Sequence, residues 1–190
     1  MSTVTTLPMM TTDELLALPE DGMERELIGG RLREREMTRR NPWHSSSLCF
    51  IVGLLQDWLK TRPRPHGRVF GGEAGFRIRK NPDTTVGIDV AYVSAEMAAA
   101  IPRNAALIDG PPILAVEILS PSDKQEDIQD KVDEYLKSGV KLVWIVEPVF
   151  QTVTVYRPDA PPTMFNDTQE LSAEPHLPGF RAAVAELFGK

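Results

Sequence analysis

Two carboxylates stand inside strongly apolar runs of the sequence. Asp89 lies in the strand-like run 87–93 (GIDVAYV), and Glu117 lies in the run 113–119 (ILAVEIL). An ionised carboxylate is rarely buried unless it is paired or binds a metal. A helical pattern that contains Lys131 follows the second run. Two carboxylates and a lysine that converge at strand and helix ends would make a hydrolytic metal site.

Strand periodicity predicts how the two carboxylates are placed. Alternation groups Ile88, Val90 and Tyr92 on one face of the first strand. Asp89 then projects from the opposite face, among small and apolar neighbours. The run around Glu117 is apolar on both faces, which is typical of a central strand covered on both sides. We therefore favour a functional interpretation of Glu117 over a buried structural ion pair.

A divalent cation explains why two like charges would be held together. Asp89 and Glu117 on adjacent strands would repel each other in a low-dielectric site. Mg²⁺ or Mn²⁺ removes that repulsion, because carboxylate oxygens are the ligands these hard cations prefer. The main-chain carbonyl of Ile118 could supply another oxygen. Such a cation can polarise a phosphodiester and lower the pKa of a bound water, while a nearby lysine holds that water or offsets charge on the phosphate.

The helix after the second run offers two lysines for this role. Residues 122–125 have the spacing of a capping box and predict the helix start, and Gly139 predicts its end. At about 100° per residue, Lys131 falls about 40° from Tyr135, at the edge of the packing stripe. Lys124 lies near the same edge. Either lysine would ordinarily extend to solvent, and either could point along the sheet toward the carboxylates.

The other periodic segments predict a mixed α/β fold. Helical spacing is present at 12–18, 43–60 and 95–101, and Cys49 and Phe50 widen the apolar stripe of the long helix, which we expect to be well covered. A hairpin is predicted at 24–33 around the glycine pair 29–30. Further strands are predicted at 68–70, 74–79, 142–146 and 153–156, the last as an edge strand. After residue 157 the chain is proline-rich and weakly patterned, up to a final packing segment at 177–188.

Two further polar residues have an ordinary interpretation. His44, in the first turn of the long helix, is of the kind that usually caps a helix or lies at the surface, although it could lean into a site at that end. Glu26 precedes an apolar pair in the hairpin, and taken alone it is expected to be an exposed strand position beside Arg25. Spacing alone therefore assigns neither residue to a site.

The composition is that of an ordinary globular protein. With 190 residues, 42% of them hydrophobic, we expect one domain over residues 1–190, with residues 1–11 mobile. No apolar run approaches the roughly 20 residues of a membrane span. The N-terminus also lacks the order of a secretory signal, which favours a cytoplasmic protein. Cys49 is the single cysteine, so neither an internal disulfide nor a cysteine zinc site can form.

The net charge of −6 argues against indiscriminate nucleic-acid binding but is compatible with a local basic patch. Basic residues gather in two clusters, Arg31, Arg33, Arg35, Arg39 and Arg40, and then Arg62, Arg64, His66 and Arg68. For each cluster the favoured interpretation is solvated charge on loops. A glycine-rich phosphate loop, a serine nucleophile elbow and histidines at zinc-binding spacing are all lacking, which argues against those chemistries.

Short motifs follow one another along the chain in a characteristic order. They are the segments 26–30, 87–90, 116–122, 139–140 and 143–148, together with His44 and the pair Lys131 and Tyr135. In this order and spacing they resemble the Uma two family of predicted endonucleases, within the PD-(D/E)xK nuclease superfamily. The similarity covers residues 24–156, with a weaker part at 177–180. Each motif alone is a weak signal, and the set together is fairly specific.

The resemblance implies both a fold and a set of site residues. The implied fold is a restriction-endonuclease-like core over about 24–156, with a mixed central β-sheet flanked by helices. The implied metal ligands are Asp89 and Glu117, and Glu26 becomes an additional acidic member of the site.

Two positions depart from the superfamily pattern. Ile88 stands where the motif has a proline, which does no chemistry. Leu119 stands where the motif has its lysine, so the lysine must come from elsewhere. Lys131, on the following helix, is the natural substitute, as in family members in which this lysine has migrated.

Three hypotheses for function follow. The preferred one is a Mg²⁺- or Mn²⁺-dependent endonuclease that hydrolyses DNA, with Asp89, Glu117 and Ile118 on the metal and Glu26 and Lys131 assisting. The alternative is a catalytically inactive module of the same fold that binds nucleic acid or protein, favoured by the acidic net charge and the lysine missing at 119. A third is an interaction protein that pairs through the strand at 153–156. A homodimer would suit a nuclease that cuts two strands, and no membrane association is expected.

Overall fold

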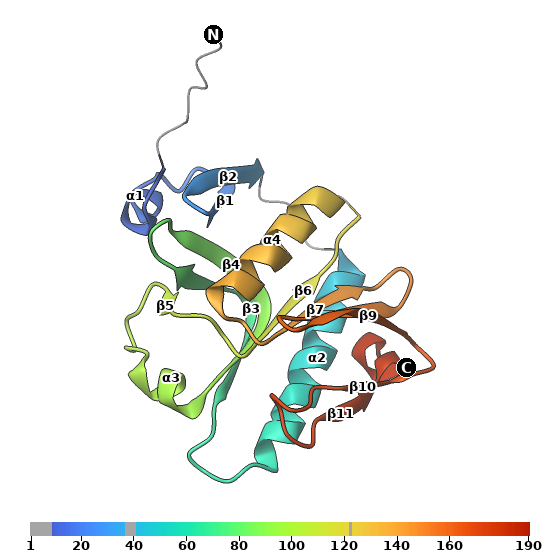
Figure 1. Cartoon of the computed structure of the whole chain (residues 1–190). Helices are drawn as coiled ribbons and strands as arrows, with labels where there is room; N and C mark the ends of the chain where they lie inside the picture. The colour runs from blue at the N-terminus through green and yellow to red at the C-terminus, as the bar shows by residue number, and fades with distance from the viewer. Residues whose placement is uncertain (1–8, 37–40, 122) are drawn as a thin grey trace.

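A computed structural model describes residues 9–36, 41–121 and 123–190, which form a large mixed sheet with helices on both faces (Figure 1). The helices are α1 (Thr12–Leu16), α2 (Pro42–Lys60), α3 (Ala95–Ala100), α4 (Gln125–Ser138) and the 3₁₀ helix η1 (Val184–Phe188). The strands are β1 (Met23–Ile28), β2 (Arg31–Glu36), β3 (Arg68–Arg79), β4 (Thr84–Val93), β5 (Ile108–Asp109), β6 (Leu114–Ile118), β7 (Leu142–Glu147), β8 (Thr152–Arg157), β9 (Ala160–Asn166), β10 (Glu170–Ser172) and β11 (Arg181–Ala183).

The main sheet has the order β2-β1-β4-β6-β7-β8-β9, and β3 pairs with both β4 and β5. Neighbours along this order are antiparallel except for β6 and β7, which are parallel and are connected through α4. The predicted mixed α/β fold with a central sheet is therefore confirmed. The predicted central position of the Glu117 strand is also confirmed, because β6 lies between β4 and β7.

Two apolar clusters cover the two faces of the sheet. On one face, α2 packs Ile51, Leu55 and Leu59 against residues of β4, β6, β7 and β8 and the C-terminal segment. On the other face, α4 packs Val132 and Tyr135 against the opposite side chains of the same strands. Helix α2 and helix α4 can therefore both send side chains to the same edge of β4 from opposite faces.

The sheet divides along one edge of β4, and this division creates space for a site. Strand β3 pairs along almost the whole of β4 on one edge. On the other edge, β1 pairs only at Leu27 with Thr85, whereas β6 pairs with residues 90–92. No strand pairs with residues 87–89 along this edge within the described part of the chain. We call this division the fork.

The alternation predicted around Asp89 is wrong at one position. Val90 and Tyr92 pack in the α2 cluster, but Ile88 packs in the α4 cluster instead of with them. The register of β3 against β4 shifts between the pairs Gly71–Val90 and Ala74–Ile88, which leaves two residues opposite Asp89. Such an irregularity increases the local twist and re-aims the side chain beside it.

The edge of the sheet also differs from the prediction. Strand β8 pairs with both β7 and β9, so the segment 153–156 is not an edge and the pairing hypothesis built on it is wrong. The strand at this edge of the main sheet is β9, which lies in the segment that we expected to be weakly patterned. Its two prolines lack N–H donors, and an edge strand tolerates them because one of its sides faces solvent. The strands predicted at 68–70 and 74–79 form one continuous β3.

Several local predictions need correction. Helix α4 begins at Gln125 with Lys124 as its N-cap and no side-chain cap, and Ser122 lies outside the described residues. Cys49 and Phe50 are exposed, so the long helix is not covered on that side. Of the segment 1–11, residues 1–8 lie outside the description, whereas Met10 N donates to the Gly30 oxygen at 2.8 Å and is therefore held.

The expected solvated arginines are only partly observed. Arg31, Arg33 and Arg35 lie on β2 rather than on a loop, and Arg33 and Arg35 form ion pairs. Arg64 and Arg68 are exposed as expected. Positions 39 and 40 of the first cluster lie outside the described residues. Within the part of the chain that the structure describes, no helix has the combined length and apolar character that a membrane crossing requires.

Replacing Glu134 by glutamine is expected to destabilise the fold by about 2 kcal/mol at pH 7. Glu134 is 9% exposed and accepts hydrogen bonds from Arg79 and from Thr84 Oγ1 (2.9 Å), which tie α4 to the ends of β3 and β4. Burial alone would raise the pKa of Glu134, but these bonds outweigh it and lower the pKa. The stabilisation is therefore present above pH 4.5 and is lost as the pH falls through the lowered value.

Urea denaturation of Glu134→Gln and wild type at pH 7 and pH 4 measures this difference. Glu170→Gln is the control, because its ion pair with Arg181 is largely exposed and should contribute little. An equal loss of stability in both variants would show that the Glu134 hydrogen bonds stabilise the fold no more than an exposed ion pair does.

Candidate active site

The fork opens into a cavity of about 700 Å³. Its walls come from β1, β2, β4, β6 and the first turns of α2 and α4, and they include Glu26, His44, Asp89, Glu117 and Lys131. All four residues predicted to act in catalysis therefore line one cavity, together with His44. Their elements are distant in sequence and meet because β1 and β6 flank the same stretch of β4.

Lys131 is the centre of this arrangement. Its Nζ donates to Glu26 Oε1 at 2.8 Å and to Glu117 Oε2 at 3.1 Å. It also donates to the main-chain oxygen of Gly87 at 3.0 Å, and the Gly87 amide donates to Glu26 Oε1 at 3.1 Å. Side chains from β1 and α4 thus satisfy the main chain of β4 where a neighbouring strand is missing. Lys131 reaches the carboxylates, as predicted, and Lys124 is only a wall residue at the cavity.

Glu117 is held by two donors from the same helix. Tyr135 lies one helical turn after Lys131, and its hydroxyl donates to Glu117 Oε1 while Lys131 donates to Oε2. Burial strongly raises the pKa of Tyr135, so this hydroxyl stays protonated. Sequence reasoning placed Tyr135 in the packing stripe and in a family motif beside Lys131, but gave it no role in the site. The four-residue spacing from Lys131 was the signal that both side chains share one helix face.

Asp89 is held from the opposite face of the sheet. Its Oδ2 accepts a hydrogen bond from the amide of Ile118 at 2.8 Å and lies 3.3 Å from His44 Nε2. An ionised carboxylate can only accept, so Nε2 carries the proton of this bond. His44 is 3% exposed, and its Nδ1 has no partner among the described residues. The expectation of a surface or capping histidine is therefore wrong, and the other possibility, a residue that leans into the site, is observed.

The protonation states of the site follow from its burial. Burial raises the pKa of Glu117 to about 7, with the Lys131 charge opposing this rise and the charges of Asp89 and Glu26 adding to it. Burial disfavours the Lys131 charge, but Glu117 and Glu26 outweigh that effect and raise its pKa. Burial also opposes the charge of Asp89, but the His44 bond and the Ile118 amide lower its pKa. The site therefore holds a charged lysine and a carboxylate charge that this lysine compensates incompletely.

These residues fit a hard divalent cation with few protein ligands. No group of three or more histidine, cysteine or acidic side chains within the described ranges is arranged to hold a metal. Mg²⁺, however, is usually bound through one or two carboxylates and keeps several waters. Asp89 and Glu117 lie next in register beyond the Val90–Val116 pair. Burial is the main cause of the raised pKa of Glu117, and the neighbouring charge of Asp89 adds to it, so a cation between the two carboxylates would favour their ionised forms.

The side chain of Glu26 shows where prediction from spacing fails. Only 15% of it is exposed, because it points at Lys131 and not into solvent beside Arg25. The resemblance placed it in the site, whereas its local sequence did not. Ile118 contributes its amide to Asp89, and its carbonyl as a metal ligand stays a prediction.

Comparisons with known proteins agree with this fold. A crystallised putative nuclease of the DUF820 family from Anabaena variabilis ATCC 29413 superposes with a TM-score of 0.78. The two share 24% sequence identity over 94% of this chain and 97% of that one. The comparison with curated proteins gives no match. The structural match is evidence for the fold only.

A family model assigns the chain. The model of the Uma2 (Uma two) family, described as putative restriction endonuclease, matches residues 12–185. This range contains every element of the main sheet and all residues of the cavity. The protein therefore belongs to the Uma2 family of putative restriction endonucleases.

Proposed function

We propose that the protein is a Mg²⁺-dependent endonuclease that hydrolyses phosphodiester bonds in DNA. The observation that carries this proposal is the convergence of Asp89, Glu117, Glu26 and Lys131 on one cavity at the fork. Carboxylates that share a buried site with a charged lysine are suited to hold a cation beside an anionic substrate. The family assignment supports a nuclease of this kind.

Each side chain has a distinct role in this proposal. Asp89 and Glu117 would hold Mg²⁺, which when bound withdraws charge from the phosphate and lowers the pKa of water. Lys131 is charged, so it orients the attacking water or stabilises negative charge on the phosphate rather than removing a proton. Glu26 positions Lys131 through the 2.8 Å bond. His44 keeps Asp89 in place from the other face of the sheet.

Conversion of supercoiled plasmid to the nicked form in Mg²⁺ and in EDTA tests this function. We expect nicking in Mg²⁺ and none in EDTA. Absence of nicking in Mg²⁺ and in Mn²⁺ would favour the second candidate, an inactive module of the same fold. That candidate is supported by Leu119 at the lysine position of the superfamily motif and by the acidic net charge.

Replacing Tyr135 by phenylalanine is expected to weaken Mn²⁺ binding about 10-fold, because groups that orient a metal ligand typically contribute 10- to 100-fold in affinity. The substitution removes only the hydroxyl that holds Glu117 and leaves the ring in the α4 cluster. Calorimetric titration gives the affinity. Tyr92→Phe, in the cluster under α2, is the matched control and should leave Mn²⁺ affinity unchanged. Equal affinities in the two variants would contradict a positioning role for Tyr135.

A further inference from the structure

Strand β2, at one edge of the main sheet, carries arginines on one of its faces. In β2, Arg31, Arg33 and Arg35 alternate with Leu32, Glu34 and Glu36. Glu34 pairs with Arg25 of β1 at 2.7 Å, and Arg33 and Arg35 line the cavity together with Glu34 and Glu36. Arginine is well suited to bind phosphate, since its planar guanidinium can donate two parallel hydrogen bonds. This row of positive charge lies in a protein whose net charge is −6.

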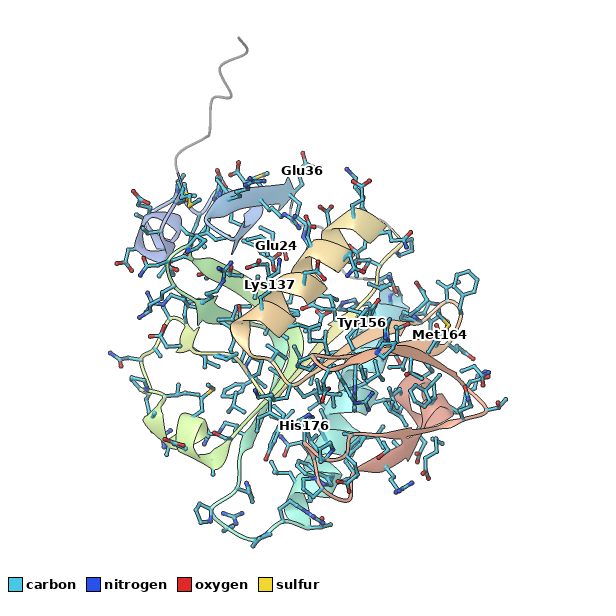
Figure 2. All side chains as sticks on the ribbon, viewed as in Figure 1. Glu24, Glu36, Lys137, Tyr156, Met164 and His176 are labelled. Carbon is cyan, nitrogen blue, oxygen red and sulfur yellow. The ribbon has the colours of Figure 1, made fainter. Side chains whose placement is uncertain are left out.

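Carboxylates at the N-terminal end of α4 form ion pairs with Arg33 and Arg35. Arg33 pairs with Asp130 at 2.5 Å and with Asp127 at 3.5 Å. Arg35 pairs with Glu24 of β1 at 2.6 Å and lies 3.6 Å from Asp123, just before the helix. Figure 2 shows Glu24 and Glu36 on the two strands of the hairpin, beside α4. The acidic residues at this end of α4 therefore neutralise Arg33, and Asp123 adds a second carboxylate near Arg35.

These contacts are suited to exchange. The side chains of Asp127 and Asp130 are 59% and 61% exposed, so solvent screens their ion pairs with Arg33 and breaking them costs little. Within the described residues, the hairpin pairs with the rest of the sheet at Leu27 with Thr85, and its turn is held by the Gly30 amide, which donates to the Asp83 oxygen at 2.6 Å. Its distal part is held over the cavity by side chains, among them the Lys131–Glu26 contact. Replacement of α4 carboxylates by phosphates therefore requires no break in the main sheet.

We propose that Arg33 and Arg35 bind the phosphodiester backbone of the nucleic acid, and that Asp123, Asp127 and Asp130 compete with it for these arginines in the free protein. This inference rests on the proposed function and adds to it the residues that hold the substrate. The acidic residues of α4 then act as an internal phosphate mimic, so that only a strand able to displace them reaches the cavity.

Two substitutions that should change DNA affinity in opposite directions test this competition. A fluorescein-labelled 30-base-pair duplex is titrated with the full chain in EDTA, so that it binds without being cut. Arg33→Gln is expected to weaken binding about 10-fold and to lower the slope of log Kd against log salt by about 1. Asp130→Asn is expected to tighten binding about 3-fold, because it releases Arg33. If these ion pairs had only a structural role, both substitutions would weaken DNA binding or leave it unchanged.

Asp133→Asn controls for the change in charge. Asp133 lies on the same helix and is exposed, and its Oδ1 accepts a hydrogen bond from Gln129 Nε2 at 2.9 Å. The effect of Asp130→Asn should exceed that of Asp133→Asn at equal salt. In the Arg33→Gln background, Asp130→Asn should no longer tighten binding, since the arginine that it frees is absent. Thermal melts verify that each variant is folded.

The outcomes separate this inference from the proposed function. If wild type nicks plasmid but Asp130→Asn binds DNA no more tightly than Asp133→Asn, the competition is wrong and the nuclease proposal stands. The competition is also wrong if Asp130→Asn tightens binding equally with and without Arg33. If wild type neither nicks plasmid nor binds the duplex, the proposed function fails and this inference fails with it.

Discussion

Replacing Asp89 by asparagine is expected to lower the rate of plasmid nicking in Mg²⁺ at least about 1,000-fold. The substitution preserves size and one oxygen that can accept from the Ile118 amide, but it removes the charge that would hold the cation. A bound cation supplies several kcal/mol of charge stabilisation in the transition state, and each 1.36 kcal/mol corresponds to a factor of 10 in rate. Initial rates of conversion from supercoiled to nicked plasmid give the ratio.

Asp83→Asn is the matched control for this loss. Asp83 sits in the turn before β4, where it accepts hydrogen bonds from Thr12 far from the cavity. The control should lose some stability and keep its nicking rate at a temperature where it is folded. A wild-type rate in folded Asp89→Asn would show that Asp89 does not bind a catalytic metal.

Replacing Lys131 by methionine is expected to have two large effects. Nicking should fall about 100-fold or more, because the charged group that stabilises the phosphate is gone. The free energy of unfolding without metal should fall by about 3 kcal/mol at pH 8, since Glu26 and Glu117 are left in a buried site without their cation. Urea denaturation and nicking assays on the same preparation give both quantities.

The stability effect has a defined pH dependence. Without the lysine, burial raises the pKa of Glu117 beyond the value of about 7 that it has in wild type. A carboxyl whose pKa is raised in the folded state stabilises the fold at low pH, and this stability is lost as the pH rises through the raised value. The variant should therefore be much less stable than wild type at pH 8 and closer to it at pH 5.

Lys60→Met gives the corresponding control for stability. Lys60 pairs with Asp57 on the surface of α2, and both side chains are 74% exposed. Its removal should change stability little at either pH. A pH-independent loss in Lys131→Met would show that the carboxylates do not depend on its charge.

The sequence was informative where periodicity and charge coincide. Asp89 and Glu117 could be identified because a charge inside an apolar strand is costly unless it has a partner. Lys131 could be identified as a candidate because helix geometry places it at the edge of the packing stripe. These arguments depend on local pattern alone, and the central position of β6 is confirmed by its neighbours β4 and β7.

The residues that prediction from pattern missed depend on contacts between distant elements. Glu26 is largely covered because β1 pairs with β4 at Thr85 and β6 pairs with it from residue 90, which leaves residues 87–89 of that edge to side chains in the described part of the chain. His44 meets Asp89 because α2 lies on the opposite face of the sheet. Nothing in the spacing of β1 or α2 contains this information. Strand β9 was not predicted for another reason. At the edge of the sheet it is mostly exposed, so it has no alternating burial pattern, and it does not need all of its N–H donors.

Calorimetric titration of Mn²⁺ into wild type and Glu117→Gln at pH 8 is the decisive measurement. At this pH the Glu117 carboxyl of wild type, with a pKa of about 7, is mostly ionised and available to a cation. We expect saturable binding to wild type and loss of that binding in folded Glu117→Gln. A wild type that binds no Mn²⁺, or a variant that binds it equally well, would contradict the metal site at the fork.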